Sequence, residues 1–600
     1  MSSGVGGAPD AAGSGAPEAE ACPYLDTINR TLLDFDFEPS CSVTLESGPH
    51  VYGCLVCGKF FRGRGRSTPA YTHSVDTGHA VYVHLTRGTF HCLPDEYIIT
   101  DPSLADISAA LHPTYTEADI RALDGNSALA RDLFGRRYLS GFVGLNNLNK
   151  TDYINATVQA LAHVRPLRDY FLRLGGGATA SIGSGTNGAG DGSKKKKKRK
   201  RDDSKSAPTK PISTDPSTHS SLAQCFGELI RKMWSNERFK ATVDPHMFVQ
   251  AVSAASKKRY HIGRQAEAGE FLAWLLHQLH VGIGGGRKAG SSIIHDVFQG
   301  TVEVTIRQRK QGENGGDGID DDDDRAGSDD EETIKAKEAE RERKKAEAER
   351  EVIIDETTMD TQFLQLTLDI PEKPLFKDAD GGLVIPQEPL VSVLSKFDGT
   401  SFSDAIGRGG IAQKRRYRLR KLPNYLVLHL TRFKKNEFTV EKNPTIVSFP
   451  IKNLDLSQYV IQRKGEGKET PPTEQEVRAM GVKDLKKLLA KHGQSDIAQS
   501  MVEKSELVEA CVDFVTKSLP DMLADKYDLV ANITHHIPAE VGREEQRDLL
   551  QEGSYHCHVQ HKGTGQWYDI QDLHVEETMP QLIGVSESYV LIFERKGGLA

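Results

Sequence analysis

The stretch that decides the fold reads Gly144-Leu145-Asn146-Asn147-Leu148-Asn149-Lys150-Thr151-Asp152-Tyr153-Ile154-Asn155. Its first half is rich in Gly and Asn, the residues that most readily adopt left-handed backbone angles in turns. Its second half continues into residues 156–162, where the apolar side chains at 154, 158, 161 and 162 share one helical face. The stretch therefore predicts a loop that runs into a helix. Asp152 would lie near the helix N-terminus, where free amides and partial positive charge collect.

The composition predicts a multidomain protein with long unburied segments. The chain has 600 residues, of which 38% are hydrophobic, and one core rarely covers this length. No run of eighteen apolar residues occurs, which argues against a membrane-spanning helix. Residues 1–21 are Gly/Ala-rich, lack the apolar segment of a signal peptide and are expected to form a disordered tail. Five of the eight Cys lie between positions 22 and 92, a distribution typical of metal binding in a reducing compartment.

A small metal-binding domain is predicted at residues 22–120. A C-x-x-C knuckle lets two thiolates reach one metal ion, and two histidines follow it within about twenty residues. The predicted zinc ligands are Cys54, Cys57, His73 and His79. Cys41 is an additional candidate ligand. The alternative is that the histidines are surface residues unrelated to the knuckle.

The rest of the chain predicts a second domain, residues 136–600, with three insertions. Helical periodicity over residues 219–282 gives way after Ser291 to a period of two and more β-branched residues. The insertions are residues 175–214, a Gly/Ser/Lys-rich linker, residues 310–352, which are acidic and then mixed in charge, and residues 462–525. The third is expected to be helical and resembles a SAP-like helix–loop–helix, with a plain helical insert as the alternative.

The first insertion contains eight consecutive positive charges, from Lys194 to Arg201. Such a run is typical of a nuclear-import signal, and the sequence therefore predicts a nuclear protein. An RNA-contacting patch and a solvated linker are the alternatives.

Several strings resemble motifs of the ubiquitin-specific protease family. The opening stretch resembles its Cys box, G-L-x-N-L-G-N-T-C-Y-x-N, and places Asp152 at the nucleophile position. Residues 265–271 resemble Q-x-D-A-x-E-F, and residues 422–433 resemble L-P-x-x-L-x-x-x-L-x-R-F. Residues 22–115, and Pro49 to Cys92 especially, resemble the UBP-type zinc finger. The resemblance implies an α+β protein, in which that finger precedes a papain-like cysteine-protease fold of thumb, palm and fingers.

The same resemblance implies one zinc ion and no second metal. Larger family members hold up to three metals in this finger, but Arg62 stands here where a Cys is expected. The family's finger often binds the free tail of ubiquitin through aromatic residues near its last Cys pair. Because residues 90–94 read Phe-His-Cys-Leu-Pro, we expect no tail binding here.

The catalytic positions of the family are degenerate in this chain. Residues 553–555 align with its G-H-Y box, which places Ser554 at the general-base position, and residues 567–572 align with W-Y-x-F-[DN]-D, which places Gln571 at the base-orienting position. A Ser cannot act as a general base at neutral pH. His556 would be displaced by roughly 6.6 Å along the strand, whereas proton transfer needs about 2.6–3.2 Å. The sequence therefore predicts no catalytic residues, with Asp152 as a helix cap.

A UBP-type finger joined to a protease fold with Asp at the nucleophile position resembles the spliceosomal, Sad-type branch of the family. That resemblance implies a catalytically inactive scaffold in pre-mRNA splicing, which supports the assembly, stability or recruitment of the tri-snRNP. Tri-snRNP proteins are then the expected partners, with snRNA and ubiquitin as further candidates. Neither a membrane nor a small-molecule substrate is expected. The alternative function is a ubiquitin-binding adaptor without protease activity.

Overall fold

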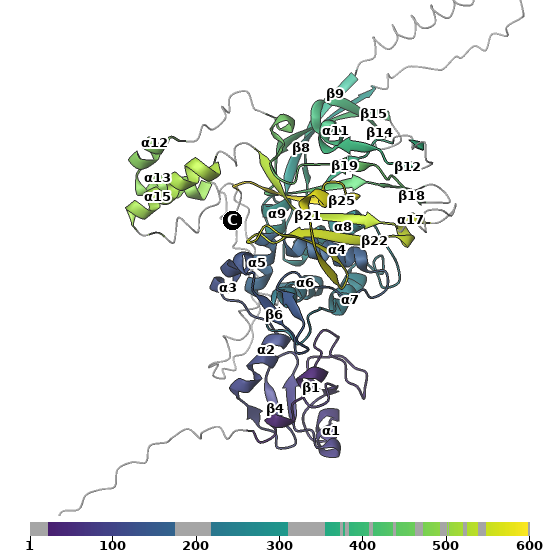
Figure 1. Cartoon of the computed structure of the whole chain (residues 1–600), viewed down its shortest axis with the longest axis vertical. Coiled ribbons are helices and arrows are strands. Elements are labelled where there is room, and N and C mark those ends of the chain that lie inside the picture. Colours follow the sequence, from purple (N-terminus) through teal and green to yellow (C-terminus); the bar gives the residue numbers. More distant parts are fainter. Residues whose placement is uncertain are drawn as a thin grey trace, which may run out of the picture.

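Three layers follow one another along the long axis of the molecule in Figure 1: an N-terminal β-domain, a group of helices and two β-sheets. The computed structural model describes residues 22–174, 218–309, 354–372, 376–377, 383–406, 412–435, 440–461, 472–491, 501, 503–519, 525–537 and 548–597. The tail 1–21, the basic run Lys194 to Arg201 and the insertions 175–214 and 310–352 lie outside these residues. Within the described ranges, no helix combines the length and apolar character needed to cross a bilayer.

The N-terminal domain is a five-stranded antiparallel sheet in the order β2-β1-β3-β4-β5. A helix, α1, lies between β2 and β3 in the chain. Its elements are β1 (Val51–Cys54), β2 (Phe60–Arg62), α1 (Pro69–Thr77), β3 (Val81–His84), β4 (Phe90–Cys92), β5 (Ile98–Ile99) and α2 (Ala105–Leu111). A proline opens α1, and Gly78 ends it with a φ of +75°, which favours glycine. Leu55, Val83 and Ile107 belong to a hydrophobic cluster of this domain.

The middle layer is helical and surrounds one completely buried helix. Its elements are α3 (Glu117–Ala122), the hairpin β6 (Leu129–Arg131) and β7 (Arg137–Leu139), α4 (Asp152–Ala162), α5 (Arg165–Arg173), α6 (Ser221–Trp234), α7 (His246–Ala255), α8 (Ala268–Gly282) and α9 (Ile293–Phe298). All residues of α4 are buried, because it contacts α5, α8 and the sheet strands β21 to β23. The sequence predicts one helix from Asp152 to about Leu174. The structure has two, because the chain turns at His163 and Pro166 occupies the first turn of α5.

Two sheets complete the fold. The larger has the order β10-β16-β25-β21-β22-β23-β24, and β20 pairs with β21 at its side; the smaller has the order β14-β15-β8-β9. Their strands are β8 (Gly300–Arg309), β9 (Ile354–Phe363), β10 (Leu366–Asp369), β14 (Asp398–Ile406), β15 (Ala412–Lys421), β16 (Tyr425–Thr431), β20 (Leu454–Asp455), β21 (Lys526–His536), β22 (Ser554–Gln560), β23 (Trp567–Gln571), β24 (His574–Thr578) and β25 (Ser588–Arg595). The sequence of residues 363–370 predicts a single strand. The structure divides it, since Phe363 ends β9 in the small sheet and Leu366 begins β10 in the large one.

Short elements connect these sheets, and the third insertion forms a group of its own. The connecting elements are β11 (Phe376–Lys377), β12 (Leu383–Val384), β13 (Gln387–Pro389), α11 (Leu390–Leu394), β17 (Phe433–Lys435), β18 (Val440–Lys442), β19 (Ile446–Ser448), α17 (Leu549–Glu552) and α18 (Pro580–Ile583). The insertion contains α12 (Glu474–Ala479), α13 (Val482–Lys491) and α15 (Lys504–Asp513), beside the sheets in Figure 1. Leu485, Leu489 and Leu507 form its separate core, so its predicted helical character is confirmed.

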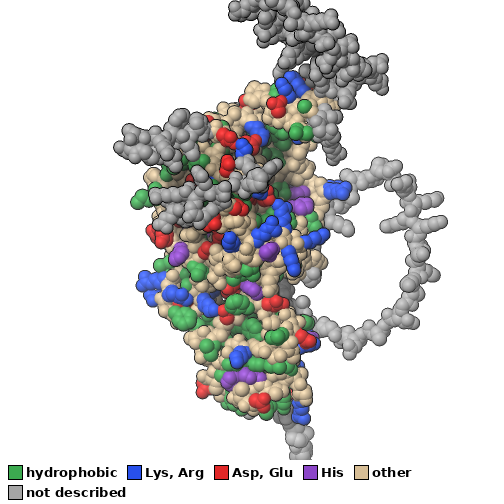
Figure 2. Space-filling view, turned by 90° about the vertical axis from the view of Figure 1, so that its right-hand side faces the viewer, with side chains coloured by type: hydrophobic (Ala, Val, Ile, Leu, Met, Phe, Trp, Pro, Cys, Tyr) green, Lys and Arg blue, Asp and Glu red, His purple; other side chains and the backbone are tan. Residues whose placement is uncertain are grey.

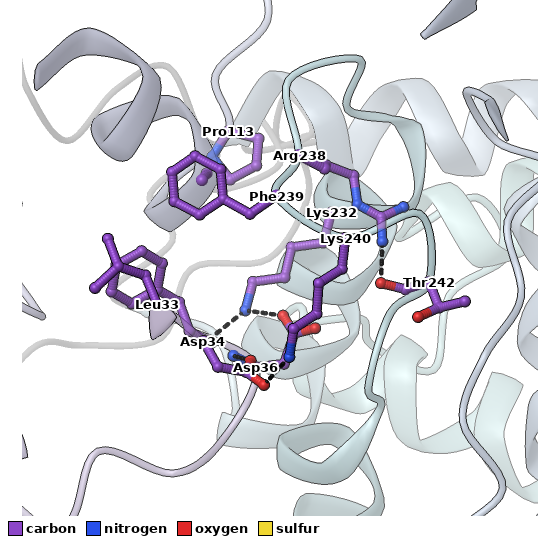
Figure 3. A pocket seen from close by; sticks show the side chains of 11 residues that line it. Leu33, Asp34, Asp36, Pro113, Lys232, Arg238, Phe239, Lys240 and Thr242 are labelled. Carbon is purple, nitrogen blue, oxygen red and sulfur yellow. Dashed lines mark hydrogen bonds and ion pairs between the residues drawn. The ribbon is translucent and has the colours of Figure 1, made fainter. Parts of the chain in front are cut away.

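Ion pairs join the N-terminal domain to the helical layer around a small pocket (Figure 3). Lys232 on α6 donates a hydrogen bond to the carbonyl of Phe35 at 2.8 Å and forms an ion pair with Asp36 at 3.1 Å. Lys240 forms an ion pair with Asp34. Only 7% of Lys232 is exposed, so water screens its interactions little. The two domains therefore meet through one buried ion pair, that of Lys232, and one partly exposed ion pair, that of Lys240.

We expect Lys232→Met to lower the free energy of unfolding by about 2–4 kcal/mol, because it leaves Asp36 and the Phe35 carbonyl without their buried partner. Urea denaturation of the variant and the wild-type protein measures this difference. The control is Lys240→Met, whose side chain is 41% exposed and whose loss should cost less than about 1 kcal/mol. Equal losses in the two variants would contradict the role given to burial.

Candidate functional site

Four side chains of the N-terminal domain converge as expected for a metal site. Cys54 ends β1, Cys57 follows in the next turn, His73 lies on α1 and His79 follows its C-terminus. One potential ligand atom from each lies within 4.8 Å of all the others, and within the described ranges no other group of three or more residues does so. The Sγ of Cys57 is 3.4 Å from His73 Nε2, and the Sγ of Cys54 is 3.6 Å from His79 Nδ1.

Local packing explains this convergence. A glycine is required at Gly58, with a φ of +73°, because a Cβ there would lie 2.2 Å from the carbonyl oxygen of Leu32. The ring of His73 stacks on Phe61 with 4.1 Å between centroids, which fixes its orientation. Cys41, the additional candidate ligand, lies outside the group of four.

Asp152 occupies a buried position at the start of α4. Its Oδ2 accepts a hydrogen bond from the backbone N–H of Tyr555 at 2.8 Å and another from Gln265 Nε2 at 3.0 Å. Only 3% of the residue is exposed, and this burial raises the pKa of its carboxyl. Its Oδ1 has no hydrogen-bond partner among the described residues. The carboxylate thus connects α4 to β22 and to the loop before α8.

The loop before Asp152 has the left-handed conformation that its composition predicts. Asn149 and Lys150 have φ values of 74° and 56°, and the N–H of Gly263 donates to the Asn149 carbonyl at 2.9 Å. The predicted capping role of Asp152 differs from what is observed, because the two hydrogen bonds that its carboxylate accepts come from β22 and Gln265 rather than from the first turn of α4. Thr151 instead accepts from the N–H of Leu148 at 2.9 Å.

The structure brings the three degenerate positions together. Ser554 begins β22, next to the Tyr555 amide that binds Asp152, and its Oγ accepts a hydrogen bond from Gln571 Nε2 on β23 at 3.2 Å. Among the described residues, no imidazole is hydrogen-bonded to Asp152, Ser554 or Gln571. The site contains hydrogen-bond donors and acceptors but no thiol that could attack a carbonyl.

Three further side chains, those of His556, Cys557 and His429, lie outside the three degenerate positions. His556 Nδ1 lies 3.4 Å from Asp569 Oδ2 on β23, so its ring faces Asp569 rather than Asp152. Cys557 packs in the core cluster that includes α4, on the opposite face of the strand as alternation predicts. The apolar strand over residues 422–433 predicts that His429 is a core residue. It is buried, and this burial lowers its pKa to about 4. Its Nε2 has no hydrogen-bond partner among the described residues.

Sequence reasoning missed the structural role of Asp572, which holds the Cys-box loop against β23. Its Oδ1 accepts from Asn155 at 2.8 Å, its Oδ2 accepts from Asn147 at 2.9 Å, and its carbonyl accepts from the N–H of Leu145 at 2.8 Å. The signal was present, since the two Asn side chains and the last Asp of the W-Y box all match the family motif. Only the fold shows that they meet.

A Cys/His finger joined to a papain-like body of helices and sheets defines the architecture of the ubiquitin-specific proteases. Comparison with family profiles agrees: the profile "Ubiquitin carboxyl-terminal hydrolase" matches residues 143–593, and "Zn-finger in ubiquitin-hydrolases and other protein" matches residues 40–104. The chain belongs to the ubiquitin carboxyl-terminal hydrolase family. The predicted α+β fold class is confirmed.

Relatives of this chain include proteins named for splicing. It is 37% identical to ubiquitin carboxyl-terminal hydrolase 39 of Mus musculus, over 96% of this chain and 80% of the relative. It is 31% identical to the probable mRNA-splicing protein ubp10 of Schizosaccharomyces pombe, over 95% of this chain and 88% of the relative. The crystal structure of an essential yeast splicing factor aligns with 96% of this chain and 99% of its own, at a TM-score of 0.57 and 20% identity. The predicted resemblance to the splicing branch is confirmed.

The raised pKa of Asp152 predicts a pH-dependent stability. The folded state holds the proton more tightly than the unfolded chain, whose Asp pKa is about 3.9. The carboxyl therefore contributes stability that is complete below that value and is lost as pH rises through the folded pKa. The Asp152→Asn variant has no carboxyl to titrate at this position, so this loss is absent. The free energy of unfolding of the variant minus that of the wild type should therefore rise with pH and then level off. Urea midpoints from about pH 4 to pH 8 measure this difference.

Asp152→Ala is the matched comparison. It leaves the buried N–H of Tyr555 without an acceptor, which should cost about 1–3 kcal/mol relative to the Asn variant. Parallel pH profiles for wild type and Asp152→Asn would show that the buried carboxyl titrates as it does in the unfolded chain.

Proposed function

We propose that this protein is a catalytically inactive, ubiquitin-specific-protease-like scaffold in pre-mRNA splicing. The observation that carries the proposal is that Asp152, Ser554 and Gln571 stand at the positions where the family has its catalytic triad. Asp152 accepts a hydrogen bond from the Tyr555 amide, and Ser554 accepts one from Gln571. The names of the relatives support the splicing role. One further relative, 26% identical over 71% of this chain, is the pre-mRNA-splicing factor SAD1 of Saccharomyces cerevisiae.

The chemistry of the site supports the absence of protease activity. Hydrolysis by this family's route needs a thiolate, an imidazole to activate it and a group to orient the ring. Burial raises the pKa of the Asp152 carboxyl, and Ser554 Oγ accepts a hydrogen bond from the side-chain amide of Gln571. Loss of one triad member costs on the order of 10⁴–10⁶ in rate, and here all three positions differ.

Partners and location follow from the same proposal. Tri-snRNP proteins are the proposed partners and the nucleus is the proposed location, with the basic run Lys194 to Arg201 as the import signal. Basic and acidic side chains are interspersed over much of the face shown in Figure 2. Such a surface suits polar docking to protein partners better than the single-sign field that binds bare nucleic acid.

Zinc is the proposed cofactor, bound by Cys54, Cys57, His73 and His79. Two thiolates and two imidazoles are the donor set of structural zinc sites, and the observed ligand separations suit one tetrahedral ion. The ion would fix the turn after β1 to α1. Its role is structural, because all four positions are filled by protein ligands.

The splicing role is tested by affinity purification of the tagged full-length protein from nuclear extract, followed by mass spectrometry. Tri-snRNP proteins should be recovered as a set. In parallel, purified ubiquitin is titrated against the protein. The alternative, a ubiquitin-binding adaptor, draws on the Cys-box loop that Asp572 keeps in place. Micromolar ubiquitin binding without recovery of tri-snRNP proteins would favour that alternative.

Catalytic inactivity is tested with a fluorogenic ubiquitin conjugate. We expect wild-type protein and Asp152→Ala to give the same background rate, because in the part of the chain that the structure describes the site has no thiol and no imidazole hydrogen-bonded to Asp152 or Ser554 that could activate a nucleophile. Turnover that scales with the amount of wild-type protein and disappears in Asp152→Ala would refute the proposal.

The zinc assignment is tested by metal analysis. We expect one tightly bound zinc per chain, lost in Cys57→Ser together with a fall in the stability of the N-terminal domain, because metal binding energy is folding energy in such domains. Cys41→Ser should keep the zinc, since Cys41 lies outside the group of four. Zinc loss in Cys41→Ser with retention in Cys57→Ser would reassign the ligands.

A further inference from the structure

A second cluster of metal-ligating side chains lies on the large sheet, outside the degenerate site. His556 and His558 alternate with Cys557 along β22, so both imidazoles project from the same face of the strand. Asp569 on β23 is directly opposite His558 in the register. The face is not covered completely: the side chains of His556 and Asp569 are 20% and 33% exposed, whereas that of His558 is 9% exposed.

The separations within this cluster are too long for ordinary hydrogen bonds. His556 Nδ1 is 3.4 Å from each carboxylate oxygen of Asp569, and His558 Nε2 is 3.8 Å from Oδ1. An N–H···O hydrogen bond usually measures about 2.7–3.2 Å. Asp569 Oδ1 has no hydrogen-bond partner among the described residues, although it is shielded from water.

The same separations suit ligands that share a metal ion. Ligand atoms at the zinc-to-nitrogen and zinc-to-oxygen distances of about 2.0–2.2 Å lie about 3.3–3.5 Å apart in a tetrahedron. The finger of this protein gives an internal comparison, with 3.4 Å between Cys57 Sγ and His73 Nε2 and 3.1 Å between His73 Nε2 and His79 Nδ1. The contacts of Asp569 with the two histidines fall in or just above this range.

A buried polar residue stands behind the cluster. Asn532 on β21 is fully buried, and its side-chain amide lies 3.2 Å from His558 Nδ1. Its Oδ1 has no partner among the described residues. With the amide turned over, that oxygen would accept a hydrogen bond from the Nδ1–H of His558 and leave Nε2 free to bind a cation, the outer-partner arrangement common around metal-bound histidines.

We propose that His556, His558 and Asp569 form a second metal site, which binds a divalent transition-metal ion such as Zn²⁺. Two imidazoles and one carboxylate are a donor set that such ions accept, with remaining coordination positions open to water or a partner's side chain. His536 on β21, whose ring centroid is 6.3 Å from that of His556, is the nearest candidate for a fourth ligand.

The site is less preformed than the finger. The three ligand atoms do not all lie within the 4.8 Å that the finger's ligands satisfy, so the two imidazoles must turn toward each other when the ion binds. A site that must be closed by its ligand binds more weakly than a preorganised one. The second site should therefore fill only after the finger and should exchange its metal more readily.

The test uses the full-length protein with zinc already in the finger, dialysed against increasing free Zn²⁺ and analysed for bound metal. One further equivalent is expected. Asp569→Asn and His558→Gln should each weaken this equivalent at least tenfold while keeping the tightly bound zinc and the wild-type circular dichroism. The matched control is His574→Gln, an exposed histidine on β24 that should leave both equivalents intact.

Two further variants refine the assignment. Asn532→Ala should weaken the second equivalent by about tenfold to a hundredfold, as loss of an outer partner does. His536→Gln should weaken it only if that ring is the fourth ligand. A wild-type protein that takes up no second equivalent, or one whose second equivalent survives in both Asp569→Asn and His558→Gln, would overturn the proposal.

Discussion

The hydrogen bond from the Tyr555 amide to the Asp152 carboxylate is the contact on which the protease-like body depends. Asp152 and Tyr555 are 403 residues apart in the chain, so this hydrogen bond joins the buried helix α4 to β22. Gln265 donates a second hydrogen bond to the same carboxylate from the loop before α8. A buried amide needs an acceptor, and a carboxylate provides a strong one. Asp at this position therefore keeps together the three elements that meet where the family has its active site.

Charge also decides how the N-terminal domain is attached. Lys232 is buried between α6 and the segment that holds Phe35 and Asp36, and it meets both a carbonyl and a carboxylate there. Partner groups left alone at such a place are costly, because water cannot replace what is lost. The zinc-finger domain and the helical layer consequently present their surfaces in one fixed arrangement, which is what a docking scaffold requires.

Short local motifs made much of the metal site and of the loop before Asp152 predictable from the sequence. The C-x-x-C knuckle with its histidines and the left-handed Asn149 and Lys150 loop follow from residue type and spacing, whereas the degenerate triad positions follow from the resemblance to the family's motifs. Contacts across the fold were not predictable in this way. Asp572 reaches Asn155, Lys232 reaches Asp36, and Asp569 faces two histidines only because of strand register and domain packing. The division of one predicted helix into α4 and α5 was missed because a proline in a first helical turn continues an apolar pattern.

The side chains at the positions that align with the family's catalytic residues are hydrogen-bonded within the fold. A working thiol protease must hold reactive groups in a partly unsatisfied state, at some cost in stability. Here Ser554 and Gln571 are bonded to each other, and Asp152 is bonded to β22 and Gln265. One buried oxygen, Asp152 Oδ1, still lacks a partner among the described residues, and the desolvation behind its raised pKa is the remaining cost.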